Sequence, residues 1–69
     1  MTDEQKYQLA TLATEVERLA ASFRAHSAMA VPQDPIQAEK AYAGYIIAQT
    51  EYLQALRRLT RLQEQIASE

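Results

Sequence analysis

Apolar residues in the first part of the chain recur at steps of three and four, the spacing that places side chains on one side of an α-helix. A stripe this narrow is typical of a helix that packs against a single neighbouring helix. The pattern therefore predicts a helix over about residues 3–30. The stripe comprises Leu9, Leu12, Val16, Leu19 and Phe23, and its rhythm continues through His26 and Ala30.

The second part of the chain carries apolar residues over a wider arc, and a helix is predicted over about residues 35–67. One stripe comprises Ala38, Ala41, Tyr45, Ala48, Tyr52, Ala55, Leu59, Leu62 and Ile66, and a second stripe beside it comprises Tyr42, Ile46, Leu53 and Leu56. Together they cover about 200° of the helix, wider than the stripe that a surface helix needs. One neighbouring helix cannot cover this arc. The pattern leaves open which stripe serves a dimer and which serves another partner.

Residues 31–34 separate the two patterns. Pro32 biases Val31 away from helical geometry, so the first helix is expected to end just before it. Asp34, Pro35 and Gln37 have the order of a helix start, with an N-cap, a proline in the first turn and a glutamine three residues beyond the cap. Residues 1–69 are therefore predicted to form a single all-α domain, an antiparallel two-helix hairpin with its turn at 31–34.

The chain is short for a domain that must stabilise itself. It has 69 residues, no Cys and one His, so disulfides are excluded and a zinc site has almost no ligands. Association is the remaining means of enlarging the core, and we expect two hairpins to form a homodimeric four-helix bundle. The residues expected to hold the hairpin and the dimer together are Leu12, Val16, Leu19, Phe23, Leu53, Leu56 and Leu59.

Charge and hydropathy narrow the class of partner. Seven Lys and Arg against nine Asp and Glu give a net charge of −2, which disfavours nucleic acid as a partner. The longest nearly apolar run, residues 41–48, is far below the roughly 20 residues of a membrane span. The N-terminal residues lack the basic and apolar regions of a secretory signal, so a cytoplasmic location is expected.

Candidate chemistry is sparse, and the sequence predicts neither an enzyme nor a cofactor or metal site. The single glycine excludes a phosphate-binding loop, and no serine has an organised activating base. Recognition of a partner is the better prediction, since tyrosine and arginine suit protein interfaces. The residues expected to contact a partner are Tyr42, Tyr45, Tyr52, Arg57, Arg58 and Arg61, with Tyr7 added from the first helix. Core packing for the tyrosines and a solvated helix face for the arginines are the simpler alternatives.

His26 and Gly44 are the two remaining singular residues. His26 is interpreted either as a pH-sensitive or hydrogen-bonding anchor or, preferably, as a half-exposed side chain near the carbonyl groups at a helix end. Gly44 lies inside the second predicted helix, where glycine costs about 1 kcal/mol relative to alanine. It either permits close approach of another chain or is simply tolerated.

In size and layout the chain resembles small bacteriophage proteins that bind and disable host proteins, among them the anti-quorum-sensing proteins of Pseudomonas phages. The resemblance rests on a cysteine-free, Ala- and Gln-rich hairpin with Tyr42, Tyr45 and Tyr52 on its second helix, and it transfers no binding residue. It implies a dimeric, non-enzymatic hairpin that blocks a larger bacterial protein, such as a quorum-sensing transcription factor, by steric occlusion in the host cytoplasm. The layout is also similar to type III secretion needle co-chaperones, whose second helix is like residues 39–62; this alternative implies shielding of a needle subunit.

Overall fold

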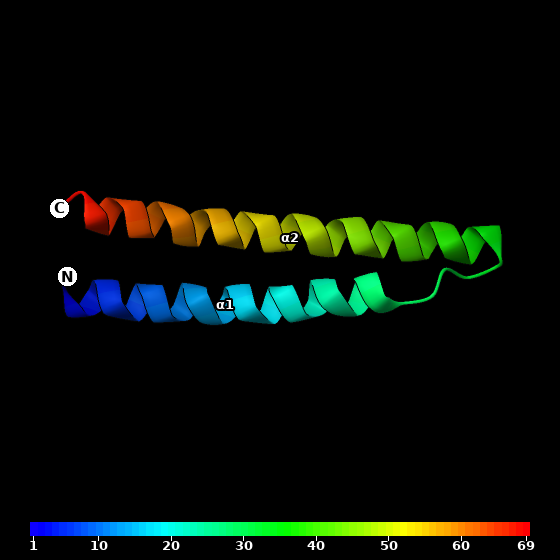
Figure 1. The fold of residues 1–69 in the computed structure, drawn as a ribbon, viewed down its shortest axis with the longest axis horizontal. Coiled ribbons are helices and arrows are strands. Elements are labelled where there is room, and N and C mark those ends of the chain that lie inside the picture. Colours follow the sequence, from blue (N-terminus) through cyan, green and yellow to red (C-terminus); the bar gives the residue numbers. More distant parts are fainter.

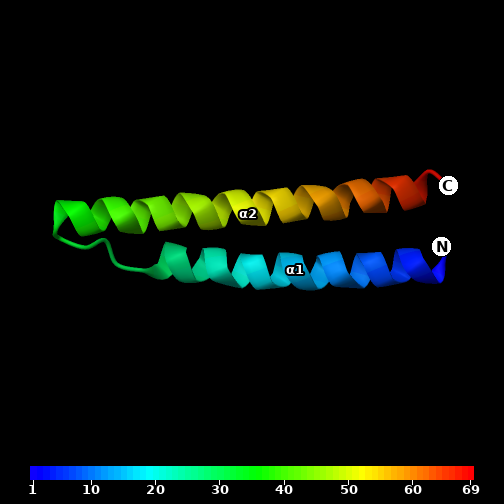
Figure 2. The ribbon, with the colours of Figure 1, turned by 180° about the vertical axis from the view of Figure 1, so that it is seen from behind.

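The computed structural model describes residues 1–69 and contains two helices, α1 (Asp3–Ala28) and α2 (Pro35–Ala67). The helices run antiparallel and side by side along their length, with both chain termini at one end (Figure 1). The view from behind shows the same pairing (Figure 2). The resulting slab measures 53 × 16 × 13 Å. The prediction of an all-α antiparallel hairpin is confirmed.

Both helices begin at residues whose side chains satisfy free backbone N–H groups. The Thr2 hydroxyl accepts a hydrogen bond from the Gln5 N–H at 3.1 Å, and the Gln5 side-chain oxygen accepts one from the Thr2 N–H at 2.8 Å. This reciprocal pair is a capping box. At the start of α2, an Asp34 carboxylate oxygen accepts from the Ile36 N–H at 3.3 Å, and Pro35, which has no N–H, adds no unpaired backbone donor to the first turn.

The turn begins two residues earlier than expected. Helix α1 ends at Ala28, because Met29 already has an extended backbone, with φ −70° and ψ 136°. The Pro32 ring disfavours helical geometry at Val31, and the extended backbone of Met29 begins the turn that crosses to the second helix. The start of α2 at Pro35 and its end at Ala67 agree with the prediction.

The hairpin interior is a thin layer of side chains between the helices. Its buried residues are Leu19, which is 5% exposed, Ala48 and Ala55. The Phe23 ring adds aromatic contacts, with its centroid 5.3 Å from that of Tyr45 and 5.9 Å from that of Tyr52. The first of the two apolar stripes of α2 therefore faces α1. Half-buried residues complete the layer: Leu9, Leu12, Val16, Ala38, Ala41, Leu59, Leu62 and Ile66.

Gly44 lies beside the imidazole ring of His26. His26 is half-buried, and its Nδ1 lies 2.8 Å from the Ser22 carbonyl oxygen one turn earlier in α1. A methyl group added at Gly44 would meet the His26 ring at 3.4 Å from Cδ2 and 3.6 Å from Nε2, which is ordinary van der Waals contact. The close approach at Gly44 is thus to α1 of the same hairpin.

We expect Gly44→Ala to stabilise the hairpin. Its backbone is helical and the new methyl group has space, so the substitution gains about 0.5–1 kcal/mol of helix propensity without a clash. In a domain of this size the midpoint of thermal unfolding should rise by about 2–8 °C, measured by circular dichroism. Ala43→Gly, at the exposed neighbouring position, should shift the midpoint in the opposite direction. A lower midpoint for Gly44→Ala would mean that His26 cannot tolerate the contact.

Candidate protein-binding surfaces

The slab has two broad faces of different chemistry. A shallow groove of about 250 Å³ crosses one of them and contains charged and amide side chains from both helices. We call this side the polar face. The residues that line the groove are Glu15, Arg18, Leu19, Glu51, Gln54 and Arg58.

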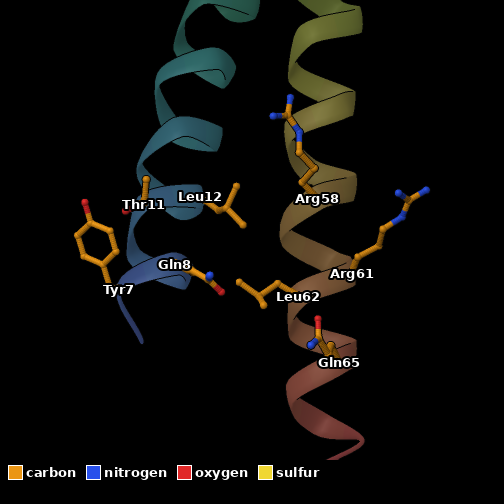
Figure 3. Close-up of a pocket in the computed structure, with 8 residues that line it drawn as sticks. All are labelled: Tyr7, Gln8, Thr11, Leu12, Arg58, Arg61, Leu62 and Gln65. Carbon is orange, nitrogen blue, oxygen red and sulfur yellow. The ribbon is translucent and has the colours of Figure 1, made fainter. Parts of the chain in front are cut away.

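A larger groove of about 470 Å³ lies between the helices near the end of the slab that holds the chain termini. We call it the open-end groove. Leu12 and Leu62 point toward each other across the helices and form its floor, while Tyr7 and Arg61 stand at the outer sides of α1 and α2 (Figure 3). Tyr7 is 73% exposed. The complete lining is Tyr7, Gln8, Thr11, Leu12, Arg58, Arg61, Leu62 and Gln65.

The open-end groove is rich in hydrogen-bond donors. Arg58 and Arg61 contribute two guanidinium groups, and no Asp or Glu lines the groove. Arg57 extends the positive surface, because it shares an adjoining cleft with Gln54 and the same two arginines. Guanidinium groups bind carboxylates through paired, charge-assisted hydrogen bonds. The groove can therefore hold an apolar side chain on its floor and an acidic side chain at its rim.

Beside the groove, the two ends of the chain are joined by hydrogen bonds. The Gln5 side-chain NH₂ donates to both carboxylate oxygens of Glu69, at 2.8 and 2.9 Å. Gln5 also belongs to the capping box, so one side chain links the start of α1 to the last residue of the chain. This link closes the end of the hairpin next to the groove.

The opposite broad face carries the second apolar stripe of α2, which the hairpin leaves uncovered. Tyr42, Ile46, Leu53 and Leu56 are each between 36% and 66% exposed. We call these four residues the α2 stripe. Each of them comes one residue after a member of the buried stripe and therefore lies about 100° further around α2. Their side chains thus point roughly at right angles to the direction from α2 to α1. Contiguous apolar surface of this kind usually marks an interaction site.

The structure separates the predicted partner-binding residues into three groups. Tyr45 and Tyr52 are half-buried against Phe23 and belong to the contact between the helices. Tyr42 is exposed on the α2 stripe. The three arginines form the positive surface at and beside the open-end groove.

The predicted core residues also divide. Those of α1 and Leu59 face the neighbouring helix, and Leu19 is the most buried of them. Leu53 and Leu56 lie outside the buried stripe and are 41% and 36% exposed, so one hairpin leaves a large part of each side chain uncovered. Ala48 and Ala55 were not among the predicted core residues, although both belong to the first apolar stripe of α2, which faces α1, and both are buried. Their small size was the available signal, because alanine at the centre of a stripe permits close helix packing.

Gln8, Leu12 and Gln65 were not predicted as parts of a binding groove, since they come together only when the helices pair. The structure brings no three metal-ligating side chains together. Neither helix has an apolar stretch long enough to cross a membrane. Comparisons with models of protein families, with curated proteins and with solved structures find no match to this chain.

Proposed function

We propose that this chain is a non-enzymatic protein-binding inhibitor that attaches to a bacterial quorum-sensing regulator and blocks it by steric occlusion. The observation that carries the proposal is the open-end groove, where Tyr7, Arg58 and Arg61 lie around an apolar floor and no Asp or Glu belongs to the lining. Tyrosine and arginine supply much of the binding energy in protein interfaces. The resemblance in size and layout to phage proteins that disable host regulators supports this class of partner and a phage origin.

The lining of the groove indicates what the partner must present. Leu12 and Leu62 favour an apolar side chain, and Arg58 and Arg61 favour an aspartate or glutamate next to it. The partner surface should therefore be acidic around an apolar centre. The hairpin is 53 Å long, so when its groove is bound to this acidic site the rest of the hairpin would cover the adjacent surface of the regulator. Other molecules could then no longer contact that surface.

A direct test uses the purified chain, a purified quorum-sensing transcription factor and its operator DNA. We expect the chain to bind the factor and release it from the DNA. The double variant Arg58→Glu, Arg61→Glu should bind at least about 30-fold more weakly, because it places carboxylates against an acidic surface and removes about 2 kcal/mol or more of contact energy. Titration calorimetry measures the affinity, and a gel-shift assay measures the release.

The matched control is Lys6→Glu, Lys40→Glu, which changes the net charge equally at exposed positions outside the groove. It should bind like the unmodified chain apart from a small, salt-sensitive change. Equal loss in both double variants would show that net charge, not the groove, determines binding. Failure of the unmodified chain to bind the factor would contradict the proposed target, and recovery of a needle subunit instead would favour the secretion co-chaperone.

A further inference from the structure

The α2 stripe requires a partner that the open-end groove does not provide, because none of its four residues lines the groove; the two surfaces adjoin at Arg61, which also shares a cleft with Leu53 and Leu56. We propose that a second copy of this chain covers the stripe, with its α2 antiparallel to the first and with the two-fold axis at the height of Glu51. The proposed inhibitor would then act as a homodimer. Four observations, about spacing, small residues, charge and area, support this arrangement.

The α2 stripe belongs to a longer seam, residues 42, 46, 49, 53, 56 and 60, whose spacing about Glu51 is the same in both chain directions. Ile46 and Leu56 lie five residues on either side of Glu51, and Gln49 and Leu53 lie two residues on either side. A two-fold axis at this height therefore puts Ile46 opposite Leu56 of the second copy and Gln49 opposite Leu53 of the second copy. Steps of four and three between these positions are those of a coiled-coil seam. Tyr42, nine residues before Glu51, then lies opposite Thr60 of the second copy, so all four residues of the α2 stripe are on the seam.

Helix α1 supplies small residues at the same height. The Phe23 ring lies against Tyr45 and Tyr52, which places Ala20 and Ala21 level with about Glu51. Ala13 and Ala20 directly follow Leu12 and Leu19 in the sequence, which places them on the side of α1 that adjoins the α2 stripe. Both are half-buried and lack bulky side chains. Two copies of α1 can therefore approach each other at the axis without a clash.

Charge complementarity selects this arrangement. Glu17 and Arg24 are exposed on the same side of α1, and they lie at equal distances from the point midway between Ala20 and Ala21. The proposed axis passes through that height, so each Glu17 faces Arg24 of the second copy, twice in the dimer. A dimer that laid the α2 stripe over α1 of the second copy would instead place Leu53 and Leu56 near Glu17, and Ile46 near Arg24.

The antiparallel order of α2 also separates the arginines. In a parallel pair Arg57, Arg58 and Arg61 would adjoin the same residues of the second copy. In the antiparallel pair the two Arg57 positions are roughly 18 Å apart along the axis, beyond the screening length of about 8 Å at physiological salt. The broad face of the slab, 53 by 16 Å, offers roughly 800 Å² per copy, the size of a standard protein interface.

Two adjacent isoleucines provide the first test. Ile46 is on the stripe and is 37% exposed, whereas Ile47 is 59% exposed and points away from it. The unmodified chain should have twice the 7.8 kDa mass of one copy in sedimentation equilibrium. Ile46→Glu should weaken the dimer by about 100-fold or more, because it buries two carboxylates. Ile47→Glu, the more exposed position, should stay dimeric. A monomeric unmodified chain, or equal effects of the two variants, would overturn the proposal.

The second test reads the register without disturbing the interface. The chain has no Cys, so an Ile46→Cys protein can be mixed with a Leu56→Cys protein in a glutathione buffer. The mixed disulfide should dominate over both symmetric ones, and Gln54→Cys, on the polar face, should form few disulfides with either. Dominance of the symmetric disulfides would indicate parallel helices and overturn the arrangement.

A charge exchange tests the contact between the α1 helices. Glu17→Arg should weaken the dimer several-fold, since it places like charges against each other, and Glu17→Arg with Arg24→Glu should restore it. No loss in the single variant, or no restoration in the double variant, would overturn the pairing. A monomer that still binds the regulator would refute the dimer alone, whereas a dimer that ignores the regulator would refute the proposed function alone.

Discussion

Leu19→Ala is expected to remove most of the stability of the hairpin. Leu19 is the one large side chain that is almost completely buried, and truncating a buried leucine costs about 2–5 kcal/mol, from both lost burial and the cavity left behind. A domain below 70–80 residues rarely gains more than about 3–5 kcal/mol from its core. The variant should therefore lose most of its helical circular dichroism at 37 °C, and its urea midpoint should fall sharply.

Ile47→Ala is the control for Leu19→Ala. It removes a comparable amount of side chain from an exposed position outside both the interior and the α2 stripe. The free energy of unfolding should then change by less than about 1 kcal/mol. Both variants must be compared at one protein concentration, because self-association adds to stability by mass action. If Leu19→Ala unfolds at the same urea concentration as Ile47→Ala, the interior described above does not hold the helices together.

Ala55→Leu is expected to destabilise the hairpin by about 1–3 kcal/mol, because the new side chain has no room. Ala55 is fully buried and Ala48 is nearly so, which means that these two methyl groups set the distance between the helices. A leucine at residue 55 would push α1 away and strain the nearby contact between Phe23 and Tyr52. The sign of this effect is informative, since leucine at a seam position of an ordinary coiled coil usually stabilises it.

The urea midpoint of Ala55→Leu, measured by circular dichroism, should be compared with that of Ala43→Leu. Ala43 lies in the same helix but is exposed, so leucine there should change stability by no more than about 0.5 kcal/mol. A higher midpoint for Ala55→Leu would show that the helices can separate at no cost, and that the alanines do not fix their spacing.

The two helices and their orientation could be predicted because their signals are local. The spacing of three and four, the Asp34-Pro35 start and the short turn each act within a few residues. The end of α1 could be predicted only to within a few residues, because a proline restricts the residue before it without specifying where the helix stops. The prediction placed the end of α1 at about residue 30, whereas the helix ends at Ala28.

The roles of the tyrosines depended on a choice between two stripes that the sequence left undecided. Tyr45 and Tyr52 share their stripe with Ala48 and Ala55, and this alternation of large and small residues accommodates Phe23 from the other helix. The α2 stripe has no comparably small residue among its apolar members. The physical basis of the choice is therefore shape complementarity between helices, which a pattern read along one helix does not include.

The open-end groove depends on the register between the helices. It combines Tyr7 and Leu12 with Arg58 and Leu62, residues that are far apart in the sequence. The length of the turn and the packing of Phe23 determine which of these residues come together. The arginines could be predicted as a cluster because they are neighbours on one helix, whereas their aromatic and apolar companions could not.

Because the two chain termini lie close together, the hairpin is suited to insertion into another protein. Gln5 donates to Glu69, so the chain enters and leaves at nearly one place, with the helix axes about 10 Å apart. The hairpin can therefore be grafted into a surface loop of a carrier protein whose two ends are similarly close. In such a graft the carrier would adjoin the open-end groove, and the turn at residues 29–34, at the far end of a 53 Å rod, would be the place for a fluorophore.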